Sequence, residues 1–152
     1  MTDNDAAMRQ HAATTPMPEF DNPAFTAAKP LAQARVAIVT SAALHVEGDT
    51  GWAPNADPMF KVIDDQARDL HLSHFSPNFD RSGFHSDINV VYPVDRLHEL
   101  AERGVIGSVA QGHYAFAGNQ DESVSAIRLD TGPNAAKLML EDGVDVVLLT
   151  PV

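Results

Sequence analysis

The sequence predicts an α/β protein: a mainly parallel sheet flanked by helices, folded as a single three-layer domain behind a flexible N-terminal arm. Short runs rich in β-branched residues alternate with amphipathic helical patterns, and this order is typical of βαβ units. The chain has 152 residues, of which 44% are apolar and 20% charged, so its length and composition are those of one globular domain.

Residues 1–30 are predicted to form the arm, and residues 31–152 the domain. The arm contains four prolines and no periodic apolar pattern. Proline fixes φ and removes a hydrogen-bond donor, so we expect neither a helix nor a central strand there, and a mobile tail over about the first fifteen residues. Phe20 and Phe25 could anchor an extended arm on the core, and a disordered leader is the alternative.

The first buried strand is predicted at residues 35–40, where Val36, Ile38 and Val39 belong to a nearly continuous apolar run. A loop of small residues and an irregular segment rich in glycine and proline follow. Residues 59–70 favour one short helix, and residues 70–75 favour a strand.

The second half of the domain is expected to begin with a strand at residues 88–93, which stops at a proline. The clearest helix covers residues 95–103, because its leucines and alanine form a stripe at a spacing of three to four residues before Gly104. Residues 105–118 are interrupted by glycines and are expected to hold at most one short strand.

A second helix is predicted at residues 133–142, with Pro133 in its first turn and Gly143 at its end. The apolar run that follows, residues 144–150, reads as a buried strand. We expect this strand and residues 35–40 to be neighbouring central strands of the sheet.

Charge and composition exclude several classes of function. Ten basic against 21 acidic residues give a net charge of −11, which repels phosphate backbones, so no nucleic acid partner is expected. The apolar runs are too short to cross a bilayer and the N-terminus lacks a secretion signal, so we expect no membrane association and a cytoplasmic location. There is no cysteine, hence no disulfide or thiolate site, and no nucleotide-binding glycine motif.

Several polar residues follow predicted strands, where α/β folds place function. His45 follows the first strand, and His113 and Tyr114 are expected in a later loop. A histidine can transfer a proton near neutral pH, and a tyrosine hydroxyl can orient a carboxylate or an amine. For each of the three, a hydrogen-bonded structural role is the alternative.

Two further pairs are candidates for substrate binding. Thr40 and Ser41 end the first strand and would lie beside Thr150, because parallel neighbours end at the same edge. Asp87 and Asn89 lie two residues apart and could bind a substrate ammonium group, or else satisfy loop backbone.

The seven histidines do not predict a metal site. His71 and His74 would point to opposite faces of a strand, and no metal-binding histidine motif is present. We expect scattered surface and loop histidines instead.

Residues 87–118, DINVVYPVDRLHELAERGVIGSVAQGHYAFAG, resemble the selenoprotein B family of glycine, sarcosine, betaine and D-proline reductases. The strongest pieces are NVVYPVDRL, GVIGSVA and HYAFAG. ARVAIVTSAALH is similar to the first strand and loop of that family, and DGVDVVLLTPV to its last strand. The resemblance runs from about Pro30 to the final residue and strengthens the case for His113 and Tyr114.

In that family a selenocysteine, or a cysteine in its place, follows the last strand. The resemblance therefore implies a selenocysteine just after Val152, with no cofactor in the given chain itself. The sequence would then be the N-terminal part of a selenoprotein, ending at a selenocysteine codon read as a stop and lacking a C-terminal helix. A true truncation or an artificial boundary is the rival explanation.

The complete protein is expected to be a reductase subunit that cleaves a C–N bond in a small amine or amino acid with electrons from a dithiol. Without its reactive residue, the chain as given should lack this activity. The resemblance implies other reductase subunits or a dithiol donor as partners, and leaves the substrate and homo-oligomerisation open. The alternative is a small, non-catalytic α/β binding or assembly subunit, because a fold alone does not settle function.

Overall fold

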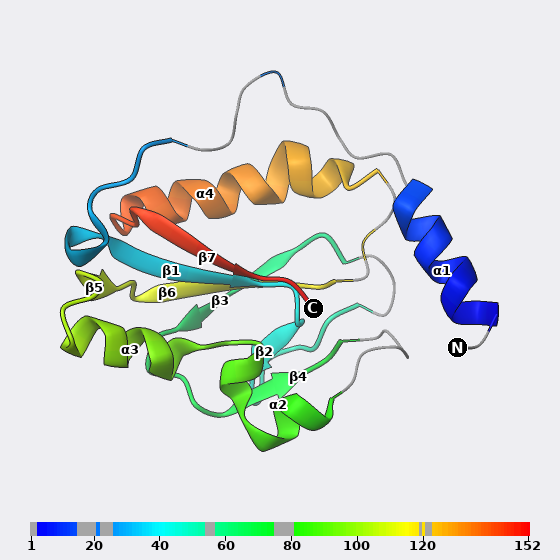
Figure 1. Cartoon of the computed structure of the whole chain (residues 1–152), viewed down its shortest axis with the longest axis horizontal. Helices are drawn as coiled ribbons and strands as arrows, with labels where there is room; N and C mark the ends of the chain where they lie inside the picture. The colour runs from blue at the N-terminus through cyan, green and yellow to red at the C-terminus, as the bar shows by residue number, and fades with distance from the viewer. Residues whose placement is uncertain are drawn as a thin grey trace.

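The computed structural model describes residues 3–14, 21, 26–53, 57–74, 81–118, 120 and 123–152. A five-stranded sheet lies between helix α4 on one side and helix α3 on the other, with a smaller two-stranded sheet below it (Figure 1). The α/β class is confirmed. The prediction of a mainly parallel, three-layer domain holds in part, because the sheet is mixed and one outer layer combines a helix with the small sheet.

Strand β1 (Arg35–Thr40) lies inside the large sheet, and β7 (Val146–Thr150) pairs with it in parallel, from Val36 opposite Val146 to Thr40 opposite Thr150. The two strands are neighbours, as the sequence predicts. However, β7 is an edge strand among the described residues and not a second central strand. Its apolar side chains are consequently exposed, with Leu149 at 67%.

On the other side of β1 lie β5 (Ser108–Val109) and β6 (Gly112–Phe116), both parallel to it. The expectation of at most one short strand in this segment was wrong, since it holds two strands, of which β6 is central. Its aromatic and small side chains fit a strand that is covered on both faces.

Strand β3 (Phe60–Asp64) pairs antiparallel with β6 and makes the sheet mixed. The helix predicted for this segment was wrong. Ile63 is buried whereas its neighbours Val62 and Asp64 are exposed, which is the two-residue period of a strand.

Helices α3 (Val94–Glu102) and α4 (Gly132–Glu141) confirm the two predicted helices to within one residue at each end. Each is followed by a glycine with positive φ, Gly104 at 69° and Gly143 at 71°, where a side chain would be strained. Helix α3 closes the main core, which includes Ile38, Ile63, Tyr92 and Leu97.

Residues 88–93 do not form the predicted strand. They contain a 3₁₀ turn, η2 (Ile88–Val90), preceded by the short helix α2 (Ser82–Ser86). The carboxylate of Asp87 accepts a hydrogen bond from the backbone N–H of Asn89, and such local bonds compete with strand pairing.

The smaller sheet consists of β2 (Leu44–Val46) and β4 (Leu70–Leu72), paired antiparallel. It confirms part of the strand predicted at residues 70–75, of which Phe75 lies outside the described residues.

The N-terminal segment contains helix α1 (Asp3–Thr14), where we expected no helix and a mobile tail. The prediction of no helix was wrong because all four prolines of the segment come after residue 14, so the proline argument does not apply to these twelve residues. The mobility of the tail and the boundary of the arm at residue 30 stay predictions. Phe20 and Phe25 lie outside the described residues, and a 3₁₀ turn, η1 (Leu31–Gln33), leads into β1. No helix in the described part of the chain is long and apolar enough to cross a membrane.

Candidate functional site

Three hydroxyl side chains meet where β1 and β7 end. Thr40 donates a hydrogen bond from Oγ1 to the carbonyl of Thr150 at 3.3 Å, and Thr150 donates to the carbonyl of Val91 at 2.9 Å. Oγ of Ser41 accepts from the N–H of Val152 at 2.9 Å. The structure thus brings Thr40, Ser41 and Thr150 together, as expected for neighbouring parallel strands.

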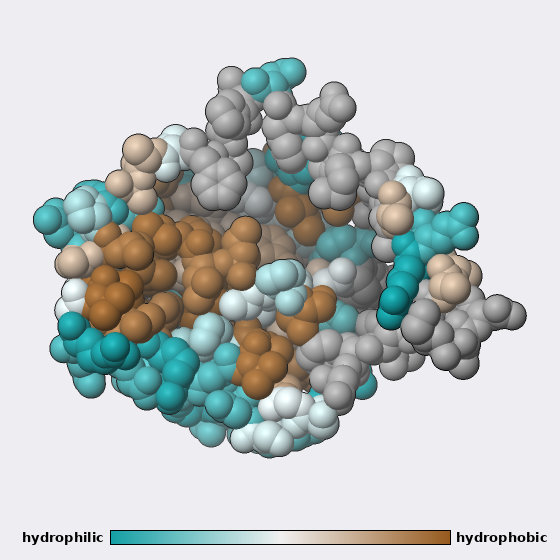
Figure 2. Space-filling model, in the orientation of Figure 1, coloured by the Kyte–Doolittle hydropathy of each residue, from teal (hydrophilic) through white to brown (hydrophobic). Residues whose placement is uncertain are grey.

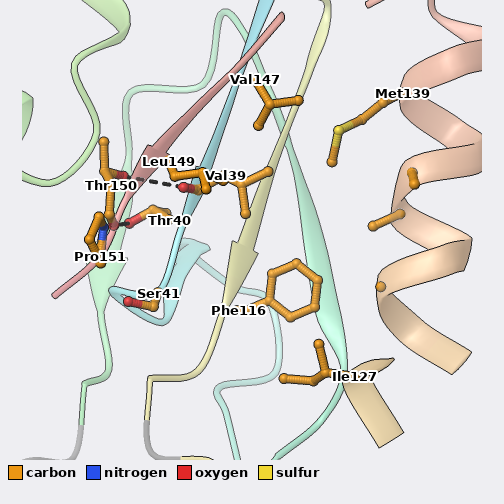
Figure 3. A pocket seen from close by; sticks show the side chains of 13 residues that line it. Val39, Thr40, Ser41, Phe116, Ile127, Met139, Val147, Leu149, Thr150 and Pro151 are labelled. Carbon is orange, nitrogen blue, oxygen red and sulfur yellow. Dashed lines mark hydrogen bonds between the residues drawn. The ribbon is translucent and has the colours of Figure 1, made fainter. Parts of the chain in front are cut away.

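Beside these hydroxyl groups, a cavity of about 550 Å³ opens between the sheet and α4 (Figure 3). Its walls are apolar and come from β1, β6, β7, α4 and the turn before α4, with Val39, Phe116, Ile127, Ala135, Ala136, Met139, Val147 and Leu149 among them. The three hydroxyl residues also line it, at the end where β1 and β7 stop. This combination of volume, apolar walls and a few polar groups is typical of small-molecule sites.

The cavity exists partly because α4 presents small side chains to the sheet. Within α4, all of whose residues are described, only Ala135 is buried, and Ala136 lines the cavity beside it. Larger side chains at these positions would fill the space between helix and sheet.

One turn of π-helix shapes the end wall of the cavity. The turn, η3 (Ile127–Thr131), continues directly into α4, and a Cβ atom at Gly132 would lie 2.5 Å from the carbonyl oxygen of Ile127. Thr131 fixes the other side of the turn by donating to the carbonyl of Pro58 at 2.7 Å. Because π-turns recur at functional sites, we add Ile127 and Gly132 to the candidate site.

His74 lies near the strand end that carries Ser41. Its side chain is buried, and a Cβ atom added at Gly118 would lie 2.7 Å from Nε2 of His74 and 3.0 Å from the carbonyl oxygen of Ser41, so the ring lies close to this end of the sheet. Burial and the guanidinium of Arg81 hold the pKa of His74 below its ordinary value, although the hydrogen bond to Val152 acts in the opposite direction. The imidazole is therefore neutral at pH 7.

His113 lies in strand β6 and not in the expected loop. Its ring is fully buried on the α3 side of the sheet, where Nδ1 accepts from the N–H of Ile38 at 3.0 Å and Nε2 faces Oδ1 of Asp65 at 3.5 Å. Burial lowers the pKa of His113, while Asp65 opposes that shift. The described lining of the cavity does not include His113, and its catalytic role stays a prediction.

Tyr114 and His45 are also absent from the described lining of the cavity. Tyr114 follows His113 in β6, so it points to the opposite face, where it lines a separate depression together with Val62 and Asp142. His45 lies in β2 with Nε2 hydrogen-bonded to Oγ of Ser73 at 3.2 Å. Catalytic roles for both stay predictions.

Asp87 and Asn89 connect η2 to the first turn of α3. The amide nitrogen of Asn89 donates to Asp87 at 2.8 Å and to Asp95 at 3.0 Å, and its amide oxygen accepts from the backbone N–H of Asp95 at 3.2 Å. These bonds satisfy polar groups at the start of a helix, which is the structural alternative stated above. Substrate binding by this pair stays a prediction.

Within the residues that the structure describes, no group of three or more histidine, aspartate or glutamate side chains could hold a metal ion.

Comparison with known proteins identifies the family. Residues 6–152 match the family described as glycine/sarcosine/betaine reductase selenoprotein B. The chain belongs to this family. This match confirms the resemblance seen in the sequence. The cavity and the hydroxyl residues Thr40, Ser41 and Thr150 therefore belong to a member of the selenoprotein B family. No solved structure matches the chain significantly.

Curated relatives are subunits of reductases. The chain is 34% identical over 124 residues to D-proline reductase subunit gamma of Acetoanaerobium sticklandii. The matched stretch covers 80% of this chain and 50% of that protein. It is 32% identical over 141 residues to glycine reductase complex component B subunit gamma of Carboxydothermus hydrogenoformans, covering 89% of this chain and 32% of the relative. It is 31% identical over 142 residues to sarcosine reductase complex component B subunit beta of Peptoclostridium acidaminophilum, with the same two shares. The chain thus spans 32% to 50% of the length of these relatives.

Sequence reasoning missed His74 and the π-turn. The sequence suggests for His74 only metal binding together with His71, and nothing in the spacing places its ring against Gly118. The π-turn had one signal, the pair Gly132 and Pro133 at the start of a helix, because a glycine there permits a close approach of backbone.

Proposed function

We propose that this chain is the amino-terminal part of a subunit of a glycine, sarcosine, betaine or D-proline reductase that acts on a C–N bond of a small amine or amino acid. The observation that carries the proposal is the position of the cavity. In a member of this family it lies at the carboxyl ends of β1 and β7, beside Thr40, Ser41 and Thr150. Open α/β sheets bind their ligands at this edge.

The family resemblance implies a selenocysteine, or a cysteine, directly after Val152, and this residue is part of the proposal. A selenocysteine would supply an ionised nucleophile at neutral pH, where a cysteine thiol is mostly protonated, and a dithiol would supply the electrons. The surroundings fit it, because Pro151 lines the cavity and the backbone of Val152 is held by Ser41.

The residues of this chain would then hold the substrate and exclude water. The apolar walls would take the hydrocarbon part of the substrate, with the strand ends that carry Thr40, Ser41 and Thr150 at one end of the cavity. There the hydroxyl groups of Thr40 and Thr150 are already engaged with backbone carbonyls, so they fix the strand ends and leave the substrate's charge to other groups. His113, Tyr114 and His45 remain candidates for proton transfer and orientation, and Asp87 and Asn89 for ammonium binding.

The names of the relatives describe them as subunits or components of reductase complexes. We accordingly propose that this chain works with other reductase subunits and a dithiol donor, in the cytoplasm. The alternative is a non-catalytic assembly subunit. The exposed apolar side chains of β7 favour it, since they gather on one face of the molecule (Figure 2).

The genomic sequence beyond the codon for Val152 provides the first test. An in-frame UGA followed by codons for a cysteine-bearing helix is expected, whereas an ordinary stop without further coding sequence favours the assembly subunit. The encoded full-length protein, with selenocysteine or cysteine at that position, is then assayed with partner subunits and dithiothreitol on glycine, sarcosine, betaine and D-proline. We expect one of them to be reduced, and serine at the same position to abolish turnover. No turnover of any of the four in the complete complex would overturn the proposal.

A further inference from the structure

A second depression, of about 380 Å³, lies between the end of α4 and the paired strands β3 and β6. Asp64 at the end of β3 lies opposite Gly112 at the start of β6, and Val62 lies opposite Tyr114. Residues two apart in a strand point to the same face, so Asp64, Val62 and Tyr114 face the depression together. The other wall comes from the end of α4, with Leu138, Glu141 and Asp142.

The hydroxyl group of Tyr114 opens into this depression and makes no hydrogen bond to any residue that the structure describes. Tyr114 is only 3% exposed, and its ring packs against Phe60 with the ring centroids 5.8 Å apart. The hydroxyl lies at the start of β6, because a Cβ atom added at Gly112 would be 3.9 Å from its oxygen. Buried tyrosine hydroxyl groups usually have a partner, so this oxygen is available to a ligand in the depression.

Acidic side chains outnumber basic ones around this hydroxyl group. Asp142 forms an ion pair with Arg35 at 3.0 Å, whereas Lys137 lies 3.9 Å from Glu141 and both of these side chains are largely exposed. The carboxylate of Asp64 has no ion pair within the described part of the chain. The depression therefore keeps a negative charge that its own neighbours do not balance.

The end of α4 adds to the attraction for a cation. The carboxyl end of a helix carries a partial negative charge, so basic residues stabilise the last turn and acidic residues destabilise it. The last turn of α4 contains no basic residue, and Glu141 and Asp142 stand at its end instead. A cation bound beside them would remove this unfavourable interaction.

Apolar side chains border the same charges. Val62 and Leu138 line the depression and are 51% and 39% exposed. No three carboxylate or histidine side chains in the described residues are placed to hold one metal ion. A cation that carries a hydrocarbon stem therefore fits the depression better than a metal ion, because the stem would cover apolar surface that now faces water.

We propose that this depression is a binding site for an organic ammonium ion. The ammonium group donates a hydrogen bond to the hydroxyl oxygen of Tyr114 and faces the carboxylate of Asp64, while a short hydrocarbon stem packs on Val62 and Leu138. The site lies where β6 begins, at the edge of the sheet opposite to the ends of β1 and β7. It is separate from the cavity of the proposed function and does not rest on that function.

The first test is an NMR titration of the ¹⁵N-labelled chain of 152 residues with n-butylammonium chloride at pH 7, with sodium chloride keeping the ionic strength constant. We expect saturable shifts of the amide signals of Gln111, Gly112 and Asp142, which lie at the depression. Butyrate and n-butanol have the same stem without the positive charge, and we expect them to bind these residues at least about tenfold more weakly. Shifts without saturation up to about 50 mM butylammonium, or equal binding of butyrate, would overturn the inference.

The second test compares variants by the same titration. Tyr114→Phe removes the hydroxyl oxygen and keeps the ring that packs on Phe60, so we expect Kd to rise about tenfold. Asp64→Asn changes an exposed carboxylate and should raise Kd about threefold. The matched control is Glu102→Gln, which removes an exposed carboxylate from α3 on the other face of the sheet and should leave Kd within twofold.

Two outcomes of this comparison would overturn the site. One is an unchanged Kd in both Tyr114→Phe and Asp64→Asn. The other is an equal rise of Kd in Asp64→Asn and Glu102→Gln, because the ammonium ion would then respond to the overall negative charge and not to the depression. Asp64 is exposed, so Asp64→Asn keeps the test decisive if Tyr114→Phe does not fold.

Discussion

Two glycines in the candidate site are required for steric reasons. At Gly132 a Cβ would meet the carbonyl oxygen of Ile127, and at Gly118 it would meet His74 and the carbonyl oxygen of Ser41. Neither φ is positive, so the constraint is the close approach of neighbouring atoms and not the backbone conformation. At this scale a single methyl group is enough to change the wall of the cavity or the seat of His74.

Gly132→Ala is therefore expected to destabilise the protein by about 1–3 kcal/mol, because the clash with the carbonyl of Ile127 forces the π-turn to rearrange. Urea unfolding measures the change. Gly83→Ala is the matched control, since it lies in helix α2 and its Cβ would make an ordinary contact at 3.4 Å with Val90. The control should change stability by less than about 1 kcal/mol. Equal urea midpoints for the parent and Gly132→Ala would contradict the prediction, because they would mean that η3 accommodates the added methyl group without loss of stability.

At the scale of elements, β7 is the least protected part of the fold. One side pairs with β1, while the other side has no strand partner among the described residues, and Leu148 and Leu149 are exposed at 38% and 67%. Exposed apolar edge strands present unpaired N–H and C=O groups to other chains, and natural proteins protect such edges with charge, especially lysine. Nothing of that kind interrupts VVLLT.

We expect Leu149→Lys to reduce self-association of the 152-residue chain, because a lysine on the edge opposes pairing with a second chain. Sedimentation velocity at several concentrations measures the association. The free energy of unfolding should change by no more than about 0.5 kcal/mol, as is usual for exposed positions. Leu129→Lys serves as control, since Leu129 is 80% exposed but lies in η3 and not on the edge strand. Equal suppression of association by both variants would mean that charge alone, and not the edge, controls it.

For the whole molecule, three partly or fully buried histidines connect stability to pH. Burial is the main cause that lowers the pKa of His45, His74 and His113 below the ordinary value of about 6.5. The unfolded chain therefore binds more protons than the folded one below about pH 6.5, so the free energy of unfolding falls as pH falls through this range. The carboxylates with lowered pKa, such as Asp145, lose their contribution only in a separate range below about pH 4.

We expect the urea midpoint of the parent to fall between pH 7.5 and pH 5.5. The midpoint of His113→Gln should fall less over the same range, because this variant lacks one of the three histidines. Each unit of pKa shift is worth up to about 1.4 kcal/mol. The net charge of −11 decreases over the same range and reduces self-repulsion, which acts in the opposite direction. The difference in slope between the parent and His113→Gln is therefore the decisive quantity. His85→Gln, which removes an exposed imidazole in α2, is the control, and equal slopes for the parent and His113→Gln would contradict the prediction.

The sequence by itself determined the parts of the fold whose signals are local. Helices α3 and α4 follow from amphipathic spacing and a glycine after each end, and β1 and β7 follow from nearly continuous apolar runs. The pairing of these two strands also places Thr40, Ser41 and Thr150 together. The family likewise could be identified from the sequence. The tertiary structure alone decided which apolar runs pair. Residues Phe60–Asp64 form a strand because they pair antiparallel with β6. Residues 88–93 do not form a strand, because the carboxylate of Asp87 accepts a hydrogen bond from the N–H of Asn89. It also decided that His113 is buried with its Nδ1 bonded to the N–H of Ile38, since this contact joins residues 75 positions apart and spacing along the chain carries no information about it.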